Sequence, residues 1–148
     1  MKLIFLDIDG VMNSQSGHGP YIADMEVDKL KLLKKLIDES ESSGIVLISD
    51  RRFSKPYMDQ FIKALDEFEI LLIGQLRRPK DYKDDPLDNR GKQLSDYLEE
   101  SKDNIEKIVI LDDNDEGLSE LFHEYFVLVN KYYGLNIDIY NKALEILK

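Results

Sequence analysis

Residues 2–13, KLIFLDIDGVMN, join a short apolar run to two aspartates and a glycine. The apolar part lacks the polar alternation of a half-exposed strand, so it predicts a strand that is buried on both faces. Gly10 allows a sharp bend directly after Asp7 and Asp9. Because ligands of parallel α/β sheets lie beyond the carboxyl ends of the strands, these two aspartates are placed at a candidate site.

Similar apolar runs recur along the chain, with helical patterns between them. Five strands are predicted, at residues 2–6, 44–48, 69–73, 107–111 and 125–129. Helices are predicted over 25–41, from an N-cap at Ser54 to Leu65, around 94–98, over 116–122 and over 140–147. This alternation predicts an α/β protein with a three-layer, Rossmann-like fold, in which a five-stranded parallel sheet carries helices on both faces.

Two segments rich in glycine and proline, residues 8–23 and 74–89, are expected to be irregular loops. Long loops in compact domains usually border a site. No linker or repeat divides the sequence, and 148 residues suffice for one core. We therefore expect a single domain over residues 1–148.

The composition excludes several classes of function. The chain has no cysteine, which removes disulfides, thiolate nucleophiles and Cys-ligated zinc sites. A net charge of -10 argues against coating of nucleic acid along its length. The first apolar run is too short for a signal peptide or a membrane span. A cytoplasmic protein without membrane contact or an obligate protein partner is expected.

Acidic and hydroxyl side chains follow three of the predicted strands. Asp7 and Asp9 come after the first strand, Ser49 after the second, and Asp112 and Asp113 after the fourth. Carboxylates gathered at one edge of a sheet repel one another, which favours a bound divalent cation. A site of oxygen ligands without histidine or cysteine indicates Mg²⁺.

Basic residues accompany this acidic group. Arg51 and Arg52 follow Ser49, and Arg90 and Lys92 open a later helix. These side chains suit the oxygens of a phosphoryl group that is held against a metal ion. The pattern therefore predicts phosphoryl transfer.

These three strand ends and the basic start of the later helix, in chain order, resemble the four motifs of the haloacid dehalogenase (HAD) superfamily. The segments DIDGVMN at 7–13 and IVILDD at 108–113 are more narrowly similar to the HAD phosphatase domains of RNA-repair and polynucleotide phosphatase proteins. The resemblance implies a HAD-like phosphatase that uses Mg²⁺. The intervals between the motifs leave no room for the large cap domain with which many members enclose small substrates.

The resemblance also implies a role for each matching residue. Asp7 would be the nucleophile that forms an aspartyl-phosphate, and Asp9 the general acid and base. Metal would be held by Asp7, the backbone carbonyl of Asp9 and Asp113, with Asp112 in support.

Ser49 would bind the phosphoryl group together with the cation of the third motif, for which Arg90 and Lys92 remain alternatives. Arg51 and Arg52 are candidates for substrate contact, whereas Tyr132 and Tyr133 are interpreted as packing residues.

An uncapped site favours a large phosphorylated substrate, such as a polynucleotide end. The segment from Arg51 to Lys92 holds ten basic and eight acidic residues, so it is the basic part of an acidic chain. Two alternatives stay open. One is a non-catalytic module that binds phosphorylated ends or a protein, and the other is a small-nucleotide or sugar phosphatase that is capped by oligomerisation.

Overall fold

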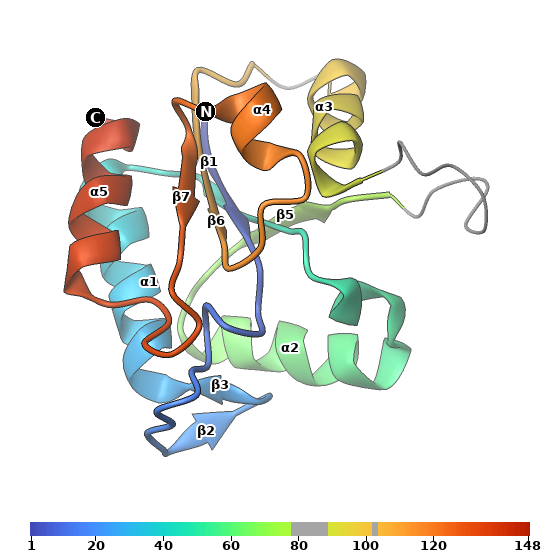
Figure 1. The fold of residues 1–148 in the computed structure, drawn as a ribbon. Coiled ribbons are helices and arrows are strands. Elements are labelled where there is room, and N and C mark those ends of the chain that lie inside the picture. Colours follow the sequence, from blue (N-terminus) through green and yellow to red (C-terminus); the bar gives the residue numbers. More distant parts are fainter. Residues whose placement is uncertain (78–88, 102–103) are drawn as a thin grey trace.

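The structure, a computed structural model, describes residues 1–77, 89–101 and 104–148. Its centre is a parallel sheet with strand order β5-β4-β1-β6-β7 (Figure 1). The strands are β1 (Lys2–Leu6), β4 (Gly44–Leu47), β5 (Leu72–Gln75), β6 (Lys107–Asp112) and β7 (Phe126–Leu128). The predicted five-stranded parallel α/β fold is therefore confirmed.

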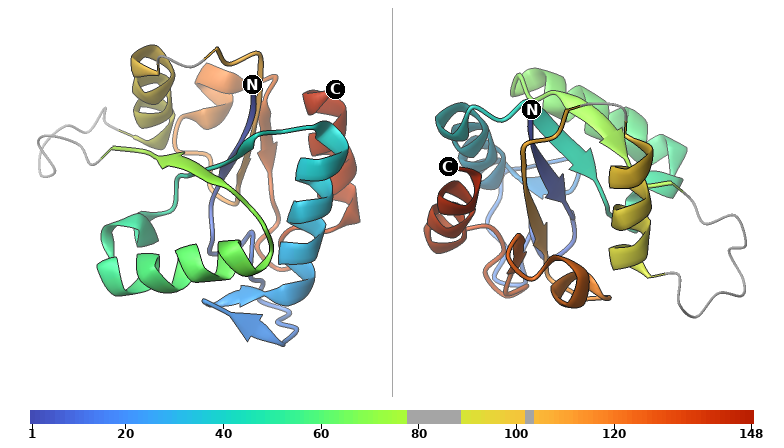
Figure 2. Two further views of the ribbon diagram at one scale, coloured as in Figure 1. Left: turned by 180° about the vertical axis from the view of Figure 1, so that it is seen from behind. Right: turned by 90° about the horizontal axis from the view of Figure 1, so that it is seen from above.

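Helices cover both faces of the sheet (Figure 2). They are α1 (Val27–Ser40), α2 (Lys55–Glu67), α3 (Arg90–Glu100), α4 (Leu118–Phe122) and α5 (Ile137–Leu147), with a 3₁₀ turn η1 (Asp50–Phe53) before α2. One core cluster lies under α1, α2 and α5, and a second lies under α3 and α4. The fold thus has three layers.

Strand β1 supplies both cores, because successive side chains of a strand point to opposite faces. Ile4 and Leu6 belong to the cluster under α1, α2 and α5, while Leu3 and Phe5 belong to the other cluster. All four side chains are at most 1% exposed. The central position of β1 places its carboxyl end, and Asp7 with it, at the middle of one edge of the sheet.

The predicted strand at 69–73 is displaced in the structure, where β5 begins at Leu72. Glu69 has a positive φ of 55° and turns the chain away from the end of α2. Ile70 is then buried, and its N–H donates to the carbonyl of Leu65. These residues end the helix, so pairing with β4 starts only afterwards.

The predicted irregular loop at 8–23 contains the first strand of a short antiparallel hairpin. This hairpin pairs β2 (Tyr21–Ile22) with β3 (Met25–Glu26). Its turn residues Ala23 and Asp24 both have positive φ, as in a type I′ turn. Glycine or asparagine usually fills such turns, so the sequence gives no hairpin signal here, and the helix predicted from residue 25 begins after β3.

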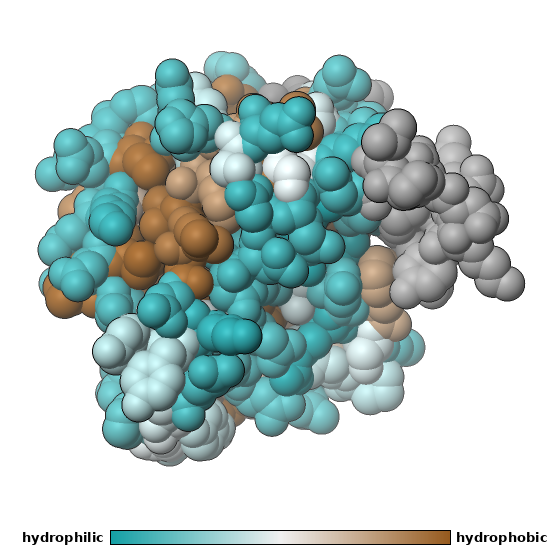
Figure 3. All heavy atoms as spheres, viewed as in Figure 1, coloured by the Kyte–Doolittle hydropathy of each residue, from teal (hydrophilic) through white to brown (hydrophobic). Residues whose placement is uncertain are grey.

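The outer surface at strand β7 carries an apolar patch over β7 and α5 (Figure 3). Leu128 is 59% exposed there, beside a groove of about 620 Å³ that Val127 and Ile146 help to line. No helix within the described residues is long and apolar enough to cross a membrane.

Candidate active site

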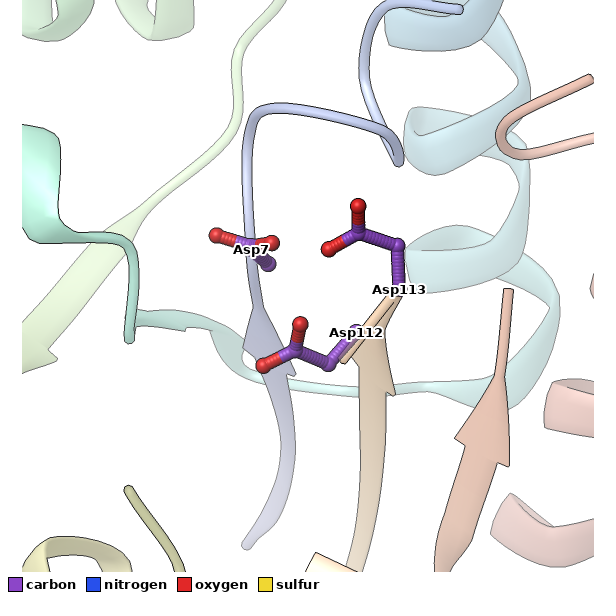
Figure 4. A group of neighbouring side chains, drawn as sticks. All are labelled: Asp7, Asp112 and Asp113. Atoms are coloured by element: carbon purple, nitrogen blue, oxygen red, sulfur yellow. The ribbon is translucent and has the colours of Figure 1, made fainter. Parts of the chain in front are cut away.

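Three aspartates meet at the carboxyl ends of β1 and β6 (Figure 4). The strands pair in parallel with Leu6 opposite Leu111, so Asp7 lies beside Asp112. The N–H of Asp7 donates to the carbonyl of Leu111 at 3.0 Å. Each of Asp7, Asp112 and Asp113 offers a carboxylate oxygen within 4.8 Å of the others.

Burial makes this acidic group unfavourable without a cation. Asp7 is 5% exposed and Asp112 is fully buried. Burial, followed by repulsion from Asp112, raises the pKa of Asp7 to about 9. Burial also raises the pKa of Asp112. A divalent cation would relieve both effects, and carboxylate oxygens suit hard cations such as Mg²⁺, so these three residues fit a metal site.

Asp113 reaches this group because Gly10 has no side chain. A Cβ at Gly10 would lie 2.2 Å from Oδ2 of Asp113. The φ of Gly10 is +82°, a conformation that side-chain-bearing residues rarely adopt. The glycine of the opening motif therefore makes room for the last carboxylate of the cluster.

We predict that Gly10→Ala weakens Mg²⁺ binding by about tenfold or more and destabilises the fold by about 1–2 kcal/mol. The added methyl group must displace the Asp113 side chain. Calorimetric titration with Mg²⁺ and thermal unfolding would measure the two effects. Gly17→Ala is a suitable control, since Gly17 also has a positive φ but lies on the exposed loop, against Tyr21. Equal Mg²⁺ affinity in the two variants would contradict the prediction.

Arg90 is the cation that the structure brings to the acidic group. Its Nη1 lies 2.5 Å from Asp112 and 3.9 Å from Asp7, while its Nε lies 3.5 Å from Glu116. Burial alone lowers the pKa of Arg90, but the charges of Asp112 and Asp7 raise it. Lys92 is exposed on the first turn of α3.

The start of α3 fixes this arrangement. Asn89 is the N-cap, and its side chain accepts from the N–H of Lys92 at 2.9 Å. Gly91 packs against the backbone of Gly117, where an added Cβ would lie 2.6 Å from the carbonyl oxygen. Close packing of this turn directs Arg90 toward the aspartates, whereas Lys92 lies on the exposed side of the helix.

Asp9 lies at the rim of the site, with its side chain 59% exposed. Arg51 donates to both of its carboxylate oxygens at 2.8 Å, and to Asp24 at 2.8 Å. The hydrogen bonds from Arg51 hold the pKa of Asp9 below its usual range. The Arg51 guanidinium also lies 4.7 Å from the centre of the Tyr57 ring. Arg51 therefore contacts the rim of the site through its hydrogen bonds to Asp9.

Ser49 and Arg52 have different surroundings. Ser49 is buried after β4 and caps η1, where its Oγ accepts from the N–H of Arg51 at 3.2 Å. The Arg52 side chain is 1% exposed and donates to the carbonyls of Ile48 and Leu76. The expectation that Arg52 contacts substrate disagrees with this position, because its donors hold the loop after β4.

Sequence reasoning missed two residues that organise the rim. Asn13 accepts from the N–H of Gly10 at 2.9 Å and donates to Asp9 at 3.2 Å. The usual asparagine turn bonds a backbone group further along the chain, whereas Asn13 bonds back to Gly10, so the sequence carried no clear signal for this contact. Asp24 binds Arg51 from the hairpin turn, and no sequence signal placed that turn beside η1.

Comparisons with known proteins bear on the family and the fold of the chain. A family model described as "HAD domain in Swiss Army Knife RNA repair proteins" matches residues 3–138. A chain from a solved structure, "Structure of Pnkp1/Rnl/Hen1 complex", has a similar fold, with a TM-score of 0.51 and 23% identity. The likeness covers 91% of this chain and 47% of that chain, so this chain spans about half of the length of that relative. No curated protein matches.

Proposed function

Because this chain belongs to the family of HAD domains in Swiss Army Knife RNA repair proteins, we propose that it is a magnesium-dependent phosphomonoesterase for polynucleotide ends. The observation that carries the proposal is the buried group of Asp7, Asp112 and Asp113 with Arg90 beside it. Residues 1–148 act as one catalytic domain in this proposal.

Asp7 is the proposed nucleophile. Its carboxylate oxygen attacks phosphorus, the bond from phosphorus to the leaving oxygen breaks, and Asp9 gives that oxygen a proton. Water then attacks the aspartyl-phosphate, Asp9 accepts a proton from it, and the bond between Asp7 and phosphorus breaks. At the end of the cycle Asp7 is again a carboxylate, Asp9 again carries its proton, and inorganic phosphate is released.

The side chains of Asp7 and Asp113 and the backbone carbonyl of Asp9 are the proposed holders of Mg²⁺. When bound, the ion supplies positive charge that stabilises the phosphoryl oxygens as charge develops on them. Asp112 is fully buried and is held in place by Arg90. This position suits Asp112 to orient the bound Mg²⁺ and the Asp7 nucleophile.

Ser49 and Arg90 are the proposed donors to the phosphoryl group, since Ser49 follows β4, the strand next to β1, and Arg90 lies 3.9 Å from Asp7. Lys92 has the weaker case, because it is exposed while Arg90 is buried beside Asp7. Arg51 must release Asp9 before that carboxyl group can take up a proton and reach a leaving oxygen, because the hydrogen bonds from Arg51 hold the pKa of Asp9 low. An anionic substrate can bind the Arg51 guanidinium and so compete with Asp9 for it.

The screen that tests this proposal measures phosphate release with and without Mg²⁺. Its substrates are 3′- and 5′-phosphorylated oligonucleotides, nucleotides, sugar phosphates and phosphopeptides. We expect turnover that needs Mg²⁺ and favours an oligonucleotide end. If no substrate is hydrolysed but phosphorylated ends bind, the domain is a non-catalytic binding module. A preference for free nucleotides or sugars would also overturn the proposed substrate.

Binding of Mg²⁺ is predicted to release a proton near pH 7. Asp7 holds a proton there in the metal-free protein, because its pKa is raised to about 9, whereas the metal needs the carboxylate. The affinity should therefore rise by up to about tenfold per pH unit toward pH 9. Calorimetry in buffers of different ionisation enthalpy measures the released protons, and Asp7→Asn is the control that should release none. An affinity that is independent of pH would contradict this assignment.

A further inference from the structure

Two adjacent tyrosines in the loop after β7 are unusually open to solvent. Tyr132 and Tyr133 are 50% and 55% exposed, so packing leaves about half of each side chain open to solvent. Their rings contact each other edge to face, with centroids 4.9 Å apart. We infer that these rings, with Tyr21, form a stacking surface for the bases of a single-stranded nucleic acid whose phosphorylated end lies at Asp7. This inference rests on the proposed function.

Hydrogen bonds fix the backbone of the loop that carries the two rings. The N–H groups of Gln15 and Ser16 donate to the carbonyls of Lys131 and Tyr132, each at 3.0 Å. The side chain of Asn130 accepts from the N–H of Tyr132 at 2.9 Å. The loop after β7 is therefore joined to the loop after β1, and the rings are presented to solvent on a fixed backbone. Such preorganisation lowers the entropy cost of stacking a base.

The same backbone connects the rings to the active site. Gly134 follows the tyrosines with a φ of +67°, and an added Cβ would lie 2.9 Å from the carbonyl oxygens of Val11 and Asn13. Asn13 in turn donates to the Asp9 carboxylate. The parallel sheet places the end of β7 at the same edge as the ends of β1 and β6. A single-stranded nucleic acid whose phosphorylated end lies at Asp7 can therefore continue over the loop after β7.

Tyr21 is a third exposed aromatic residue beside the loop after β1. It is 53% exposed, and its ring lies close to Gly17 and Gly19. Since glycine has no side chain, these neighbours leave the ring uncovered. His18 and Lys131 are also exposed nearby in the two loops, where they can meet the phosphodiester groups between stacked bases.

The net charge favours stacking over a purely electrostatic contact. A chain with a net charge of -10 gains little from long-range attraction to a phosphate backbone. Base stacking on an aromatic ring contributes about 1–3 kcal/mol per base and tolerates any sequence. The inferred ligand is thus a short single strand, held by its terminal phosphate at Asp7 and by the bases next to that phosphate.

The first test compares KM values for a phosphorylated RNA decamer and for p-nitrophenyl phosphate. The double variant Tyr132→Ala/Tyr133→Ala should raise the KM for the decamer by about 10- to 100-fold. The KM for p-nitrophenyl phosphate should stay unchanged. Tyr125→Ala is the control, because Tyr125 is 41% exposed but precedes β7 at the opposite edge of the sheet. An unchanged KM for the decamer, or equal effects on both substrates, would overturn the inference.

The second test needs no turnover. The chain contains no tryptophan, so Tyr133→Trp introduces one indole group that reports on stacking. An RNA decamer without a terminal phosphate should quench its emission, and a DNA decamer shows whether the sugar matters. Quenching without any phosphatase activity would support the stacking surface while contradicting the proposed function. Phosphatase activity with neither quenching nor a change in KM would support the proposed function and contradict the stacking surface.

Discussion

The variant Asp7→Asn should lose phosphate release, with kcat reduced by about 10⁴-fold or more. The amide has nearly the shape of the carboxyl group, so the fold and the neighbouring contacts are kept. It lacks the charged oxygen that attacks phosphorus, and no other described carboxylate holds the corresponding position after β1. Initial rates with p-nitrophenyl phosphate in saturating Mg²⁺ would measure the loss.

The same variant should be more stable than the unchanged protein when Mg²⁺ is absent. The raised pKa of Asp7 means that folding stability falls as the pH rises from about 4 toward 9, because the unfolded chain ionises first. Asparagine removes this dependence. We expect a gain of about 1–2 kcal/mol at pH 7, or roughly 3–6 °C in Tm.

Asp66→Asn on the exposed face of α2 is the matched control, and neither activity nor Tm should change. Opposite movements of activity and stability at Asp7 are difficult to explain by a purely structural role. Substantial hydrolysis by Asp7→Asn would contradict its assignment as nucleophile. A lower Tm in metal-free buffer would contradict the raised pKa of Asp7, which burial and then repulsion from Asp112 cause.

Much of this architecture was predictable because buried parallel strands leave a strong pattern. The apolar runs at 2–6 and 107–111 place Asp7 and Asp112 at strand ends before any coordinates are known. Since the carboxyl ends of parallel strands lie at one edge of the sheet, the order of the strands in the sequence is enough to predict that these acidic side chains gather there. The family resemblance drawn from these motifs is confirmed by the match over residues 3–138.

The orientation of the basic residues could not be predicted in the same way. Arg51 and Arg52 are neighbours in sequence, yet η1 directs one to Asp9 and buries the other under carbonyl oxygens. Arg90 and Lys92 likewise differ only by their positions on the first turn of α3. Such differences arise from the angle at which a turn meets the sheet, and composition and spacing contain no information on that angle.

Arg90→Met should have the largest effect on stability among these substitutions. It leaves the fully buried carboxylate of Asp112 without its cation, which typically costs about 3–5 kcal/mol. The variant should also lose about 10²- to 10³-fold in kcat, because a donor to the phosphoryl group is absent. Urea unfolding and steady-state kinetics would measure these changes. Lys92→Met is the matched control and should stay within about threefold of the unchanged activity.

A second substitution separates the two contributions of Arg90. In Arg90→Met/Asp112→Asn the buried charge is removed together with its partner, so most of the lost stability should return. Activity should stay well below that of the single variant Asp112→Asn, since the phosphoryl group still lacks its guanidinium donor. Recovery of both properties would mean that Arg90 only neutralises Asp112. A large activity loss in Lys92→Met with an active Arg90→Met would transfer the phosphate contact to Lys92.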